Sequence, residues 1–316
     1  MIWAHLVHLS YNMWIDRETC ELDGYGSIIT YRPHMRFDKA MWDELLPKMA
    51  ENGVNMLVID LGDGVQYASH PEIAVEGAWP IEMLREELDK IRKLGIEPIP
   101  KLNFSTTHDA WLGPYSRMVS TPKYYEVCAN LINECIDIFD GPRLFHLGMD
   151  EETYGHQKYH EYVVVRQYEL WWNDLMFLVD KVEKRGARAW IWSDFIWHHK
   201  DEFLARMPKS VLQSNWYYDS NLDPDTEPNV TYVKGYDQLE AAGYDQIPTG
   251  SNHSTPDNFG NTVKSCANRI APDRLKGFFQ TVWRPMTEDF RDRQTEAIEQ
   301  IGRARREFEA SESQAR

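Results

Sequence analysis

Three stretches of this sequence share one pattern: AENGVNMLVI (Ala50–Ile59), RKLGIEPIP (Arg92–Pro100) and EKRGARAWIW (Glu183–Trp192). In each, a segment with helical spacing ends at a glycine, and a short apolar run follows immediately. A glycine directly after a helix is typical of a left-handed C-cap, which stops the helix. The pattern therefore predicts helices that alternate with parallel strands.

The same alternation runs from one end of the chain to the other in eight units. Strands are expected at Trp3–Leu9, Asn55–Leu61, Ile96–Leu102, Arg143–Gly148, Arg188–Trp192, Val211–Trp216, Gln246–Thr249 and Gly277–Val282. Helices are expected at about Asp38–Asn52, Pro80–Leu94, Pro122–Phe139, Glu161–Arg185, Asp201–Met207, Tyr236–Ala242, Pro256–Ile270 and Glu288–Ala310. Eight units favour an α/β fold of one closed (β/α)8 barrel, the TIM barrel, over an open sheet.

We expect residues 1–316 to form one domain, because 316 residues are few for two domains of full size. An irregular insertion at about 11–37 follows the first strand, and Asn221–Val233 is expected to be a second long loop. A charged C-terminal helix at about 288–312 ends the chain, with a solvated tail from Arg303 onward.

The composition excludes several classes of partner. The formal net charge is −16, from 50 acidic and 34 basic residues. Binding to DNA, RNA or an anionic membrane needs an excess of Lys and Arg, so we expect none of these partners. The first residues lack the basic start and cleavage site of a signal peptide, and no apolar run reaches the ~20 residues of a membrane span. A cytoplasmic location is therefore the expectation.

Three consecutive acids, Asp150, Glu151 and Glu152, follow the fourth expected strand. Barrel enzymes build their sites from polar residues at the carboxyl ends of the strands, which makes these acids candidate catalytic groups. Acids are also common in the first turn of a helix, where the helix dipole favours them. The residues around them decide between the two interpretations.

The segment FHLGMDE (Phe145–Glu151) resembles the HxGxDE motif of family 20 glycoside hydrolases, the β-N-acetylhexosaminidases, in which it ends the fourth strand. NMLVIDLGD (Asn55–Asp63) is similar to the family's NxLxxxLxD stretch and places Asp63 on the aspartate that opens its catalytic relay. THDAW (Thr107–Trp111) resembles the segment that holds the relay histidine, here His108. The resemblance thus follows the chain in order, at strand ends.

Weaker similarities continue along the later strands and suggest residues that bind the sugar. Trp192 and Asp194 resemble the fifth-strand motif, Trp216 the sixth-strand tryptophan, and Trp283 the eighth-strand tryptophan. Aromatic faces stack on the C–H faces of sugars, although such residues near strands also belong to cores. The expected sugar-binding residues are Trp192, Asp194, Trp216, Trp283, Arg32, Trp111 and Asn252.

The resemblance implies a glycoside hydrolase that acts on a β-linked carbohydrate, with an exo mode and possible 2-acetamido specificity. Glu151 would be general acid and then general base, with its pKa tuned by His108 and Asp63. Asp150 would orient the substrate's own acetamido group, which is the nucleophile in that family. We expect neither a cofactor nor a resident metal.

The sequence also departs from the family pattern. Trp283-Arg284-Pro285 lacks the glutamate that grips sugar hydroxyls in the family, and Pro248–Ser254 has no counterpart of the acetamide-binding tyrosine. Asn252 or His253 could stand in for that tyrosine. Arg32 or Arg36 could replace the family's first-strand arginine.

Two other functions fit the same barrel. A metal-dependent carbohydrate lyase, isomerase or hydrolase would draw its ligands from the many His, Asp and Glu residues near strand ends, but no HExxH spacing appears. These ligand-capable residues are His5, His8, His108, Asp109, His146, Asp150, Glu152, Asp194, His198, His199 and His253. A non-catalytic sugar-binding barrel would explain the missing recognition residues, but it would have no need of a proton relay.

Overall fold

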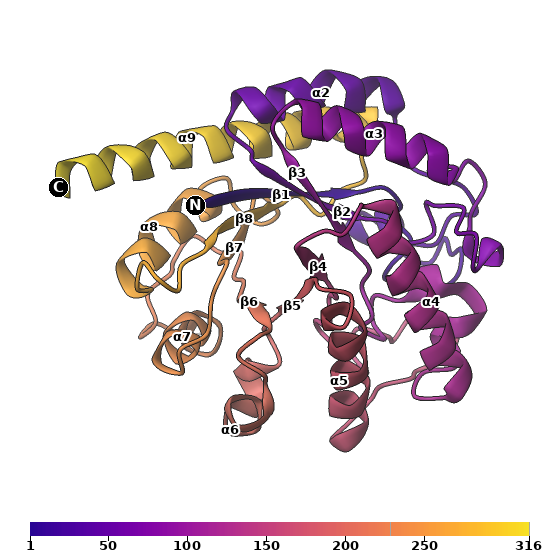
Figure 1. Cartoon of the computed structure of the whole chain (residues 1–316). Coiled ribbons are helices and arrows are strands. Elements are labelled where there is room, and N and C mark those ends of the chain that lie inside the picture. Colours follow the sequence, from indigo (N-terminus) through magenta and orange to yellow (C-terminus); the bar gives the residue numbers. More distant parts are fainter. Residues whose placement is uncertain (228, 316) are drawn as a thin grey trace.

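The computed structural model describes residues 1–227 and 229–315, so Pro228 of the second expected loop and Arg316 of the charged tail lie outside it. Within it, eight parallel strands form a single sheet in the order β6-β5-β4-β3-β2-β1-β8-β7 (Figure 1). They are β1 (Ile2–His8), β2 (Met56–Asp60), β3 (Glu97–Lys101), β4 (Leu144–His146), β5 (Arg188–Trp192), β6 (Leu212–Ser214), β7 (Thr249–Ser251) and β8 (Gly277–Thr281).

The two outer strands of that order, β6 and β7, meet and close the sheet. Parallel bridges join Gln213 with Gln246 and Trp216 with Thr249, and the backbone N–H of Ile247 donates to the carbonyl of Gln213 at 2.9 Å. Every strand therefore has a neighbour on both sides, which removes the exposed sheet edges. The predicted (β/α)8 barrel is confirmed.

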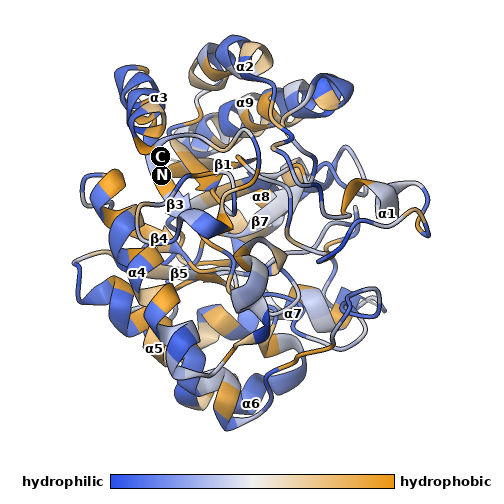
Figure 2. Cartoon of the chain, turned by 90° about the vertical axis from the view of Figure 1, so that its right-hand side faces the viewer, coloured by the Kyte–Doolittle hydropathy of each residue, from blue (hydrophilic) through white to orange (hydrophobic). Residues whose placement is uncertain are grey.

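Helices surround the strands, and their apolar faces turn toward the barrel (Figure 2). The helices are α1 (Tyr25–Ile28), α2 (Lys39–Glu51), α3 (Ile81–Lys93), α4 (Pro122–Ile138), α5 (Glu169–Glu183), α6 (Ile196–Arg206), α7 (Asn229–Ala241), α8 (Asn258–Arg269) and α9 (Arg291–Ala315). Three short 3-10 helices lie at Pro71–Ile73, Ala110–Arg117 and Glu288–Phe290. In α3 the buried side chains Leu84, Leu88 and Ile91 recur at helical spacing, which explains how that helix packs.

The ends of the helices form where local chemistry predicts. The Thr121 side chain accepts a hydrogen bond from the backbone N–H of Tyr124, and Pro122 occupies the first turn of α4. Gly95 and Gly186 follow α3 and α5 with φ angles of 76° and 83°, a conformation that other residues adopt only with strain. The glycines of the helix–glycine–strand pattern therefore end the helices that precede them.

Five elements begin three or more residues from their expected starts; one of them is α9, which begins at Arg291 rather than Glu288. Strand β7 lies later than the expected Gln246–Thr249, α5 begins at Glu169 rather than Glu161, α6 begins at Ile196 rather than Asp201, and α7 begins at Asn229 rather than Tyr236. The delay of α5 has a tertiary cause: the backbone and side chain of Arg166 both bind Glu152 across the loop. The loop expected at Asn221–Val233 is shorter, because its residues from Asn229 onward are helical.

The barrel interior buries several polar side chains. His146 is fully buried between the rings of Trp190 and Trp192, with centroid distances of 4.8 and 4.5 Å. Charge is also buried in the barrel: Lys101 and Asp60 form an ion pair that is almost completely shielded from solvent. Because an unpaired charge there would be very costly, the pair has to form whenever the barrel does.

The opposite end of the barrel, where the strands begin, is held by charge pairs. Arg143 binds Glu97 at 2.7 Å, and Asp245 pairs with Arg188 at 2.7 Å and with Lys276 at 3.2 Å. These residues border a cavity of about 760 Å³. Because barrel chemistry occurs at the carboxyl ends of strands, we assign this end to stability rather than to a reaction.

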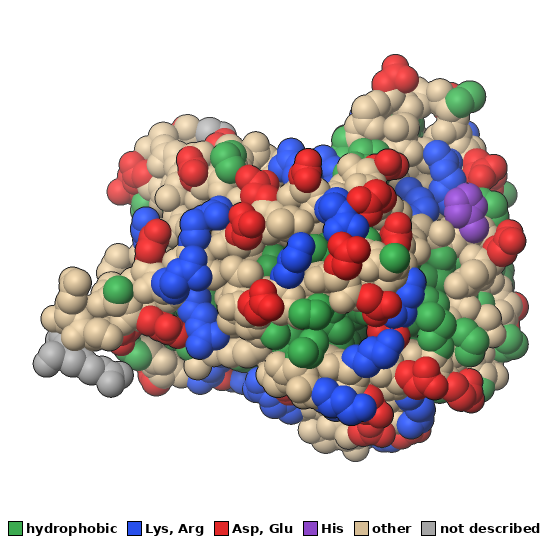
Figure 3. Space-filling model, turned by 90° about the horizontal axis from the view of Figure 1, so that it is seen from above, with side chains coloured by type: hydrophobic (Ala, Val, Ile, Leu, Met, Phe, Trp, Pro, Cys, Tyr) green, Lys and Arg blue, Asp and Glu red, His purple; other side chains and the backbone are tan. Residues whose placement is uncertain are grey.

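The outer surface mixes both signs of charge. Figure 3 shows Lys and Arg side chains interspersed with Asp and Glu on the face seen from above. On α2 and α3, Lys39 pairs with Glu87 at 3.1 Å and Lys90 with Glu87 at 2.6 Å. Among the described residues, no helix combines the length and the apolar character that crossing a membrane requires.

Candidate active site

The backbone at the end of β4 turns sharply and presents Asp150 and Glu151 at the barrel mouth. Gly148, Met149 and Glu151 have φ angles of 73°, 78° and 54°. A side chain at Gly148 would collide with Asn103, because its Cβ would lie 1.9 Å from the Oδ1 atom. Two non-glycine residues in the left-handed region within one turn indicate a backbone that the surrounding structure holds in place.

Asp150 is almost completely buried and is held in its ionised form. Its Oδ1 atom accepts a hydrogen bond from Asn103 Nδ2 at 2.8 Å and lies 3.3 Å from His108 Nδ1. Burial alone would raise the pKa of this carboxyl group. The nearby charges of His108 and Lys101 and the hydrogen bonds outweigh burial and hold the pKa far below its ordinary value.

Glu151 lies beside Asp150 but has the opposite electrostatic setting. Its side chain is 28% exposed, its Oε2 atom lies 3.6 Å from His108 Nε2, and its Oε1 atom lies 3.5 Å from His156 Nε2. Burial raises the pKa of Glu151 above its ordinary value, and the negative charge of Asp150 adds to this, against the effect of the two imidazoles. The neighbouring acids therefore differ in proton affinity.

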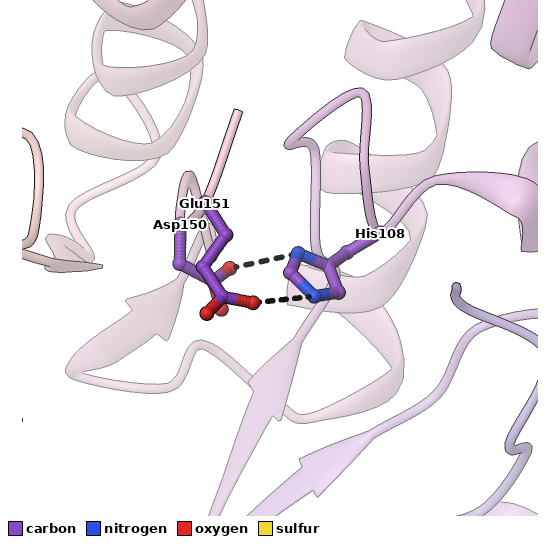
Figure 4. Close-up of side chains that lie close together, drawn as sticks. All are labelled: His108, Asp150 and Glu151. Carbon is purple, nitrogen blue, oxygen red and sulfur yellow. Dashed lines mark ion pairs between the residues drawn. The ribbon is translucent and has the colours of Figure 1, made fainter. Parts of the chain in front are cut away.

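His108 bridges the two acids through its two ring nitrogens (Figure 4). It comes from the segment after β3, where the Thr107 hydroxyl also lies 3.2 Å from its Nδ1 atom. Burial lowers the pKa of His108, but Asp150 and Glu151 outweigh burial and raise the pKa overall. His108, Asp150 and Glu151 were expected to lie at one site, and the structure places them in contact.

Asp63 does not join this group, which corrects the expected Asp63–His108 pair. Its carboxylate accepts hydrogen bonds from Ser10 Oγ and, at 2.9 Å, from Asn12 Nδ2. No ion pair or hydrogen bond between Asp63 and His108 is present in the described part of the chain. Burial raises the pKa of Asp63 to about 6, and its hydrogen bonds oppose that rise. Asp63 organises the end of β1 rather than the histidine.

Asp194, at the end of β5, supports Glu151 from another side. Its Oδ2 atom accepts the backbone N–H of Glu151 at 2.8 Å, and its Oδ1 atom lies 3.4 Å from Trp216 Nε1. Burial and the charge of Asp150 raise the pKa of Asp194 to about 8. Asp194, Trp216 and Glu151 all border a cavity of about 860 Å³.

Two further tryptophans lie at the barrel mouth. The Trp192 ring stacks on Phe279 at 5.3 Å between centroids, and Trp283 lies 6.0 Å from Trp192. Both side chains are at least nine-tenths buried, and their indole Nε1 atoms have no hydrogen-bond partner among the described residues. Trp283 also has a φ angle of 53°, so its orientation is imposed by its surroundings.

The structure does not bring the other three expected sugar-binding residues to the site. Trp111 is buried in the core, with its Nε1 atom bonded to the Asn103 carbonyl at 2.9 Å. Asn252 is fully buried and its amide donates to Glu296 on α9 at 2.9 Å. Arg32 joins the two ends of the insertion, because its backbone pairs with the Asn12 side chain. Packing and loop anchoring account for all three.

Glu152, the third acid, has a structural role. It pairs with Arg166 at 2.7 Å, and Arg166 also binds Asp174 on α5 at 3.0 Å. All three side chains are almost fully buried. This Arg166 clamp, formed by Glu152, Arg166 and Asp174, fixes the loop between β4 and α5.

Three residues that were not expected at the site approach it from the loops. His156 reaches Glu151 from the β4–α5 loop, and Trp14 in the insertion lies 5.7 Å from the His108 ring. Tyr218 stacks on Trp216 at 5.0 Å. Tyr218 follows Trp216 at strand spacing and was detectable as part of an aromatic run. For His156 and Trp14 no local pattern exists, because the loop path alone brings them to the site.

Comparison with known proteins adds information about the fold. No protein-family model and no curated protein matches the sequence. Among solved structures, a GH20 exo-β-N-acetylglucosaminidase from Vibrio harveyi superposes with a TM-score of 0.63 at 13% identity, over 95% of this chain and 54% of that one. A chitobiase from Flavobacterium johnsoniae gives 0.64 at 17%, over 88% and 49%. Dispersin B gives 0.56 at 15%, over 88% and 96%.

This chain spans about half the length of the Vibrio and Flavobacterium proteins, and most of the length of Dispersin B. At these identities the likeness concerns the fold. The expected resemblance to a family 20 barrel is confirmed at that level.

Proposed function

We propose that this chain is a glycoside hydrolase that cleaves a β-linked sugar, with Glu151 as general acid and then general base. The observation that carries the proposal is the electrostatic contrast between adjacent acids: the pKa of Asp150 is lowered, the pKa of Glu151 is raised, and His108 bridges them. In glycoside cleavage, one carboxyl group with a raised pKa can donate a proton while a neighbour with a lower pKa stays ionised.

In the first step, protonated Glu151 gives its proton to the glycosidic oxygen as the C1–O bond breaks. Ionised Asp150 accepts a hydrogen bond from the N–H of a 2-acetamido group, whose carbonyl oxygen attacks C1 and closes a cyclic oxazolinium intermediate. In the second step, Glu151 as carboxylate takes a proton from water, and the hydroxyl attacks C1 and reopens the ring. This is the substrate-assisted route, in which no protein carboxylate bonds to the sugar.

Asp150 is better suited to orient a group than to attack one. Its Oδ1 atom is already engaged by Asn103 and His108, and its side chain is only 7% exposed. A nucleophile has to move toward C1 as the new bond forms, whereas an orienting group gains from being fixed by its neighbours. These contacts support a 2-acetamido substrate.

His108 and Asp194 act as positioning residues. His108 lies between the two carboxylates and compensates their charges when both are ionised. Asp194 accepts the Glu151 backbone N–H and holds the turn that aims the Glu151 side chain. We assign the sugar platform to Trp192, Trp216 and Trp283, which lie at the ends of β5, β6 and β8; Trp216 contacts Asp194, and Trp283 lies 6.0 Å from Trp192. Because all eight strands share one closed sheet, we further infer that residues 1–316 act as one catalytic domain.

The test is a screen of chromogenic β-glycosides with and without a 2-acetamido group. Turnover restricted to 2-acetamido glycosides, with inhibition by a thiazoline that imitates the cyclic intermediate, is the expected result. Turnover of sugars without that group, insensitive to the thiazoline, would transfer the nucleophile's role to a protein carboxylate. Absence of turnover across the whole screen would overturn the assignment as a glycoside hydrolase.

One observation favours a second candidate, metal-dependent carbohydrate chemistry. His108, Asp150 and Glu151 offer one ligand atom each within 4.8 Å of one another. His, Asp and Glu together suit Zn²⁺ or a similar ion. Metal analysis of the purified protein, followed by an assay after chelation and metal return, separates this candidate: loss and recovery of activity would favour the metal.

A further inference from the structure

The cavity beside Glu151 extends well beyond the catalytic group. It runs from the end of β4 over the N-terminal ends of α5 and α6 and is bordered by Tyr168, Trp171, Phe195 and Trp197. Its volume of about 860 Å³ lies in the upper range of ligand pockets, which is ~300–1,000 Å³. Asp150 and His108 do not border it, so this space lies on one side of the catalytic group.

The chemistry of its lining indicates the class of ligand. Nine of the lining side chains are Phe, Trp or Tyr, and only Met149 and Val165 are aliphatic. An alkyl chain is normally enclosed by aliphatic side chains, whereas the alternating polar edges and C–H faces of sugars suit aromatic rings with polar groups between them. Stacking also fixes some of these rings: the ring centroid of Phe195 lies 4.0 Å from that of Trp171 and 4.3 Å from that of His199.

The loop that forms one wall of the cavity exposes apolar side chains to solvent. Of nine exposed large hydrophobic residues in the described chain, six lie between 154 and 170. Tyr154 and Tyr168 are each 78% exposed and also border the cavity. Exposed aromatic side chains clustered at the entrance of a pocket indicate a binding surface. The Arg166 clamp holds this loop, so the tyrosines lie on a fixed support.

The charges of the cavity restrict the ligand further. Glu202 and Asp219 border it, whereas its guanidinium group, Arg166, is already bound to Glu152 and Asp174. No Lys side chain borders the described cavity. A carboxylated or sulfated sugar would be repelled here, so a neutral saccharide fits best.

We propose that this aromatic cavity binds the leaving-group side of a neutral β-linked oligosaccharide, two or more sugar units long. The inference rests on the proposed function, since Glu151 would stand at the boundary between the sugar that is cleaved off and the chain that departs. Tyr154 and Tyr168 would be the outermost residues to contact the oligosaccharide. Trp197 lies nearer to the catalytic group, because its ring is 4.5 Å from that of Trp216. The site then favours chains over glycosides with small leaving groups.

The first measurement is binding, with turnover removed by Glu151→Gln. Titration calorimetry compares N,N′,N″-triacetylchitotriose with N-acetylglucosamine on this variant, and we expect the trisaccharide to bind about tenfold tighter or more. Adding Tyr154→Ala and Tyr168→Ala should abolish that advantage. The matched control is Tyr162→Ala, on the same loop and 61% exposed but outside the cavity, which should keep the advantage. Equal affinity for mono- and trisaccharide would overturn the inference.

The second measurement separates this inference from the proposed function. The ratio of kcat/KM for the trisaccharide to kcat/KM for a 4-nitrophenyl monoglycoside should fall about tenfold in the double tyrosine variant and stay constant in the Tyr162 control. An unchanged ratio would refute the leaving-group site while leaving the hydrolase intact. Tight trisaccharide binding that depends on both tyrosines, with no hydrolysis of any glycoside, would support the saccharide site and refute the hydrolase.

Discussion

The imidazole of His156 lies 3.5 Å from Oε1 of Glu151, while the ring of His108 faces the other carboxylate oxygen at 3.6 Å. Glu151 is thus enclosed by two titratable rings that come from different loops. His108 is buried, whereas the His156 side chain is 49% exposed. The outer ring is therefore accessible to solvent, and the inner one is fixed beside Asp150.

Replacing His156 should change the pH dependence of activity. A protonated imidazole favours ionised Glu151 and lowers its pKa, so His156→Gln raises that pKa further. Because the general acid must be protonated, the alkaline limb of the kcat/KM profile should move to higher pH. His199→Gln, which changes a histidine of the same cavity without contact to Glu151, is the control. An alkaline limb that stays in place or moves down would contradict this role.

Glu151→Gln should reduce kcat by about 10²–10⁴-fold while the fold is retained. The amide cannot transfer a proton, but it fills the same volume between the two histidines. Steady-state kinetics with a chromogenic β-glycoside measures the loss, and circular dichroism checks the fold. Activity within a few-fold of the wild type would remove Glu151 from the general-acid position.

Asp150→Asn should harm 2-acetamido substrates more than sugars that lack the group. The amide loses the negative charge that polarises the acetamido N–H, although it keeps a hydrogen-bonding oxygen toward Asn103. We expect kcat/KM to fall about 10²-fold or more for the acetamido glycoside and clearly less for its 2-hydroxy counterpart. Equal losses on both would indicate that Asp150 acts on the sugar ring rather than on its substituent.

His108→Asn and Asp63→Asn should differ in effect, because only His108 contacts the catalytic acids. We expect kcat to fall about 10²-fold for His108→Asn and by less than about fivefold for Asp63→Asn. Parallel kinetics of the two variants and of their combination tests this. Equal single losses that do not add in the double variant would restore the relay that links Asp63 to His108.

Arg166→Met should destabilise the protein by about 3–5 kcal/mol, because it leaves the carboxylates of Glu152 and Asp174 buried without their partner. Arg117→Met is the matched control: its pairs with Asp16 and Glu161 lie nearer the surface, and a loss of about 0–1 kcal/mol is expected. Denaturant unfolding followed by tryptophan fluorescence gives both values. A loss of only about 0–1 kcal/mol for Arg166→Met would mean that the Arg166 clamp is not important for stability.

The barrel was predictable because its signals are local. A helix, a glycine and a buried strand occur together at Gly95 and Gly186, and each glycine has the positive φ that the pattern requires. The predicted start of α5 was wrong because its cause is not local: Arg166 binds Glu152, fourteen residues earlier, and this pair diverts the backbone. Sequence spacing alone does not show such a contact.

The candidate site likewise contains residues that could be predicted from strand order and residues that could not. His108, Asp150 and Glu151 follow neighbouring strands β3 and β4, so strand order alone brings them together. Trp111 and Asn252 also follow strands, but the Trp111 indole donates to the Asn103 carbonyl and the Asn252 amide donates to Glu296 on α9. The direction of a side chain in a loop depends on how the loop folds, which strand order does not determine.

The closure of the barrel between β6 and β7 determines where the sheet should open first in solution. Isolated bridges join these two strands, whereas β1 and β2 share a continuous ladder from Ala4 to His8. The amide hydrogens along β6 and β7 should therefore exchange with deuterium before those of β1 and β2, as a unit that opens below global unfolding. Trp216 lies at this junction, so opening the barrel there would also loosen one wall of the catalytic pocket.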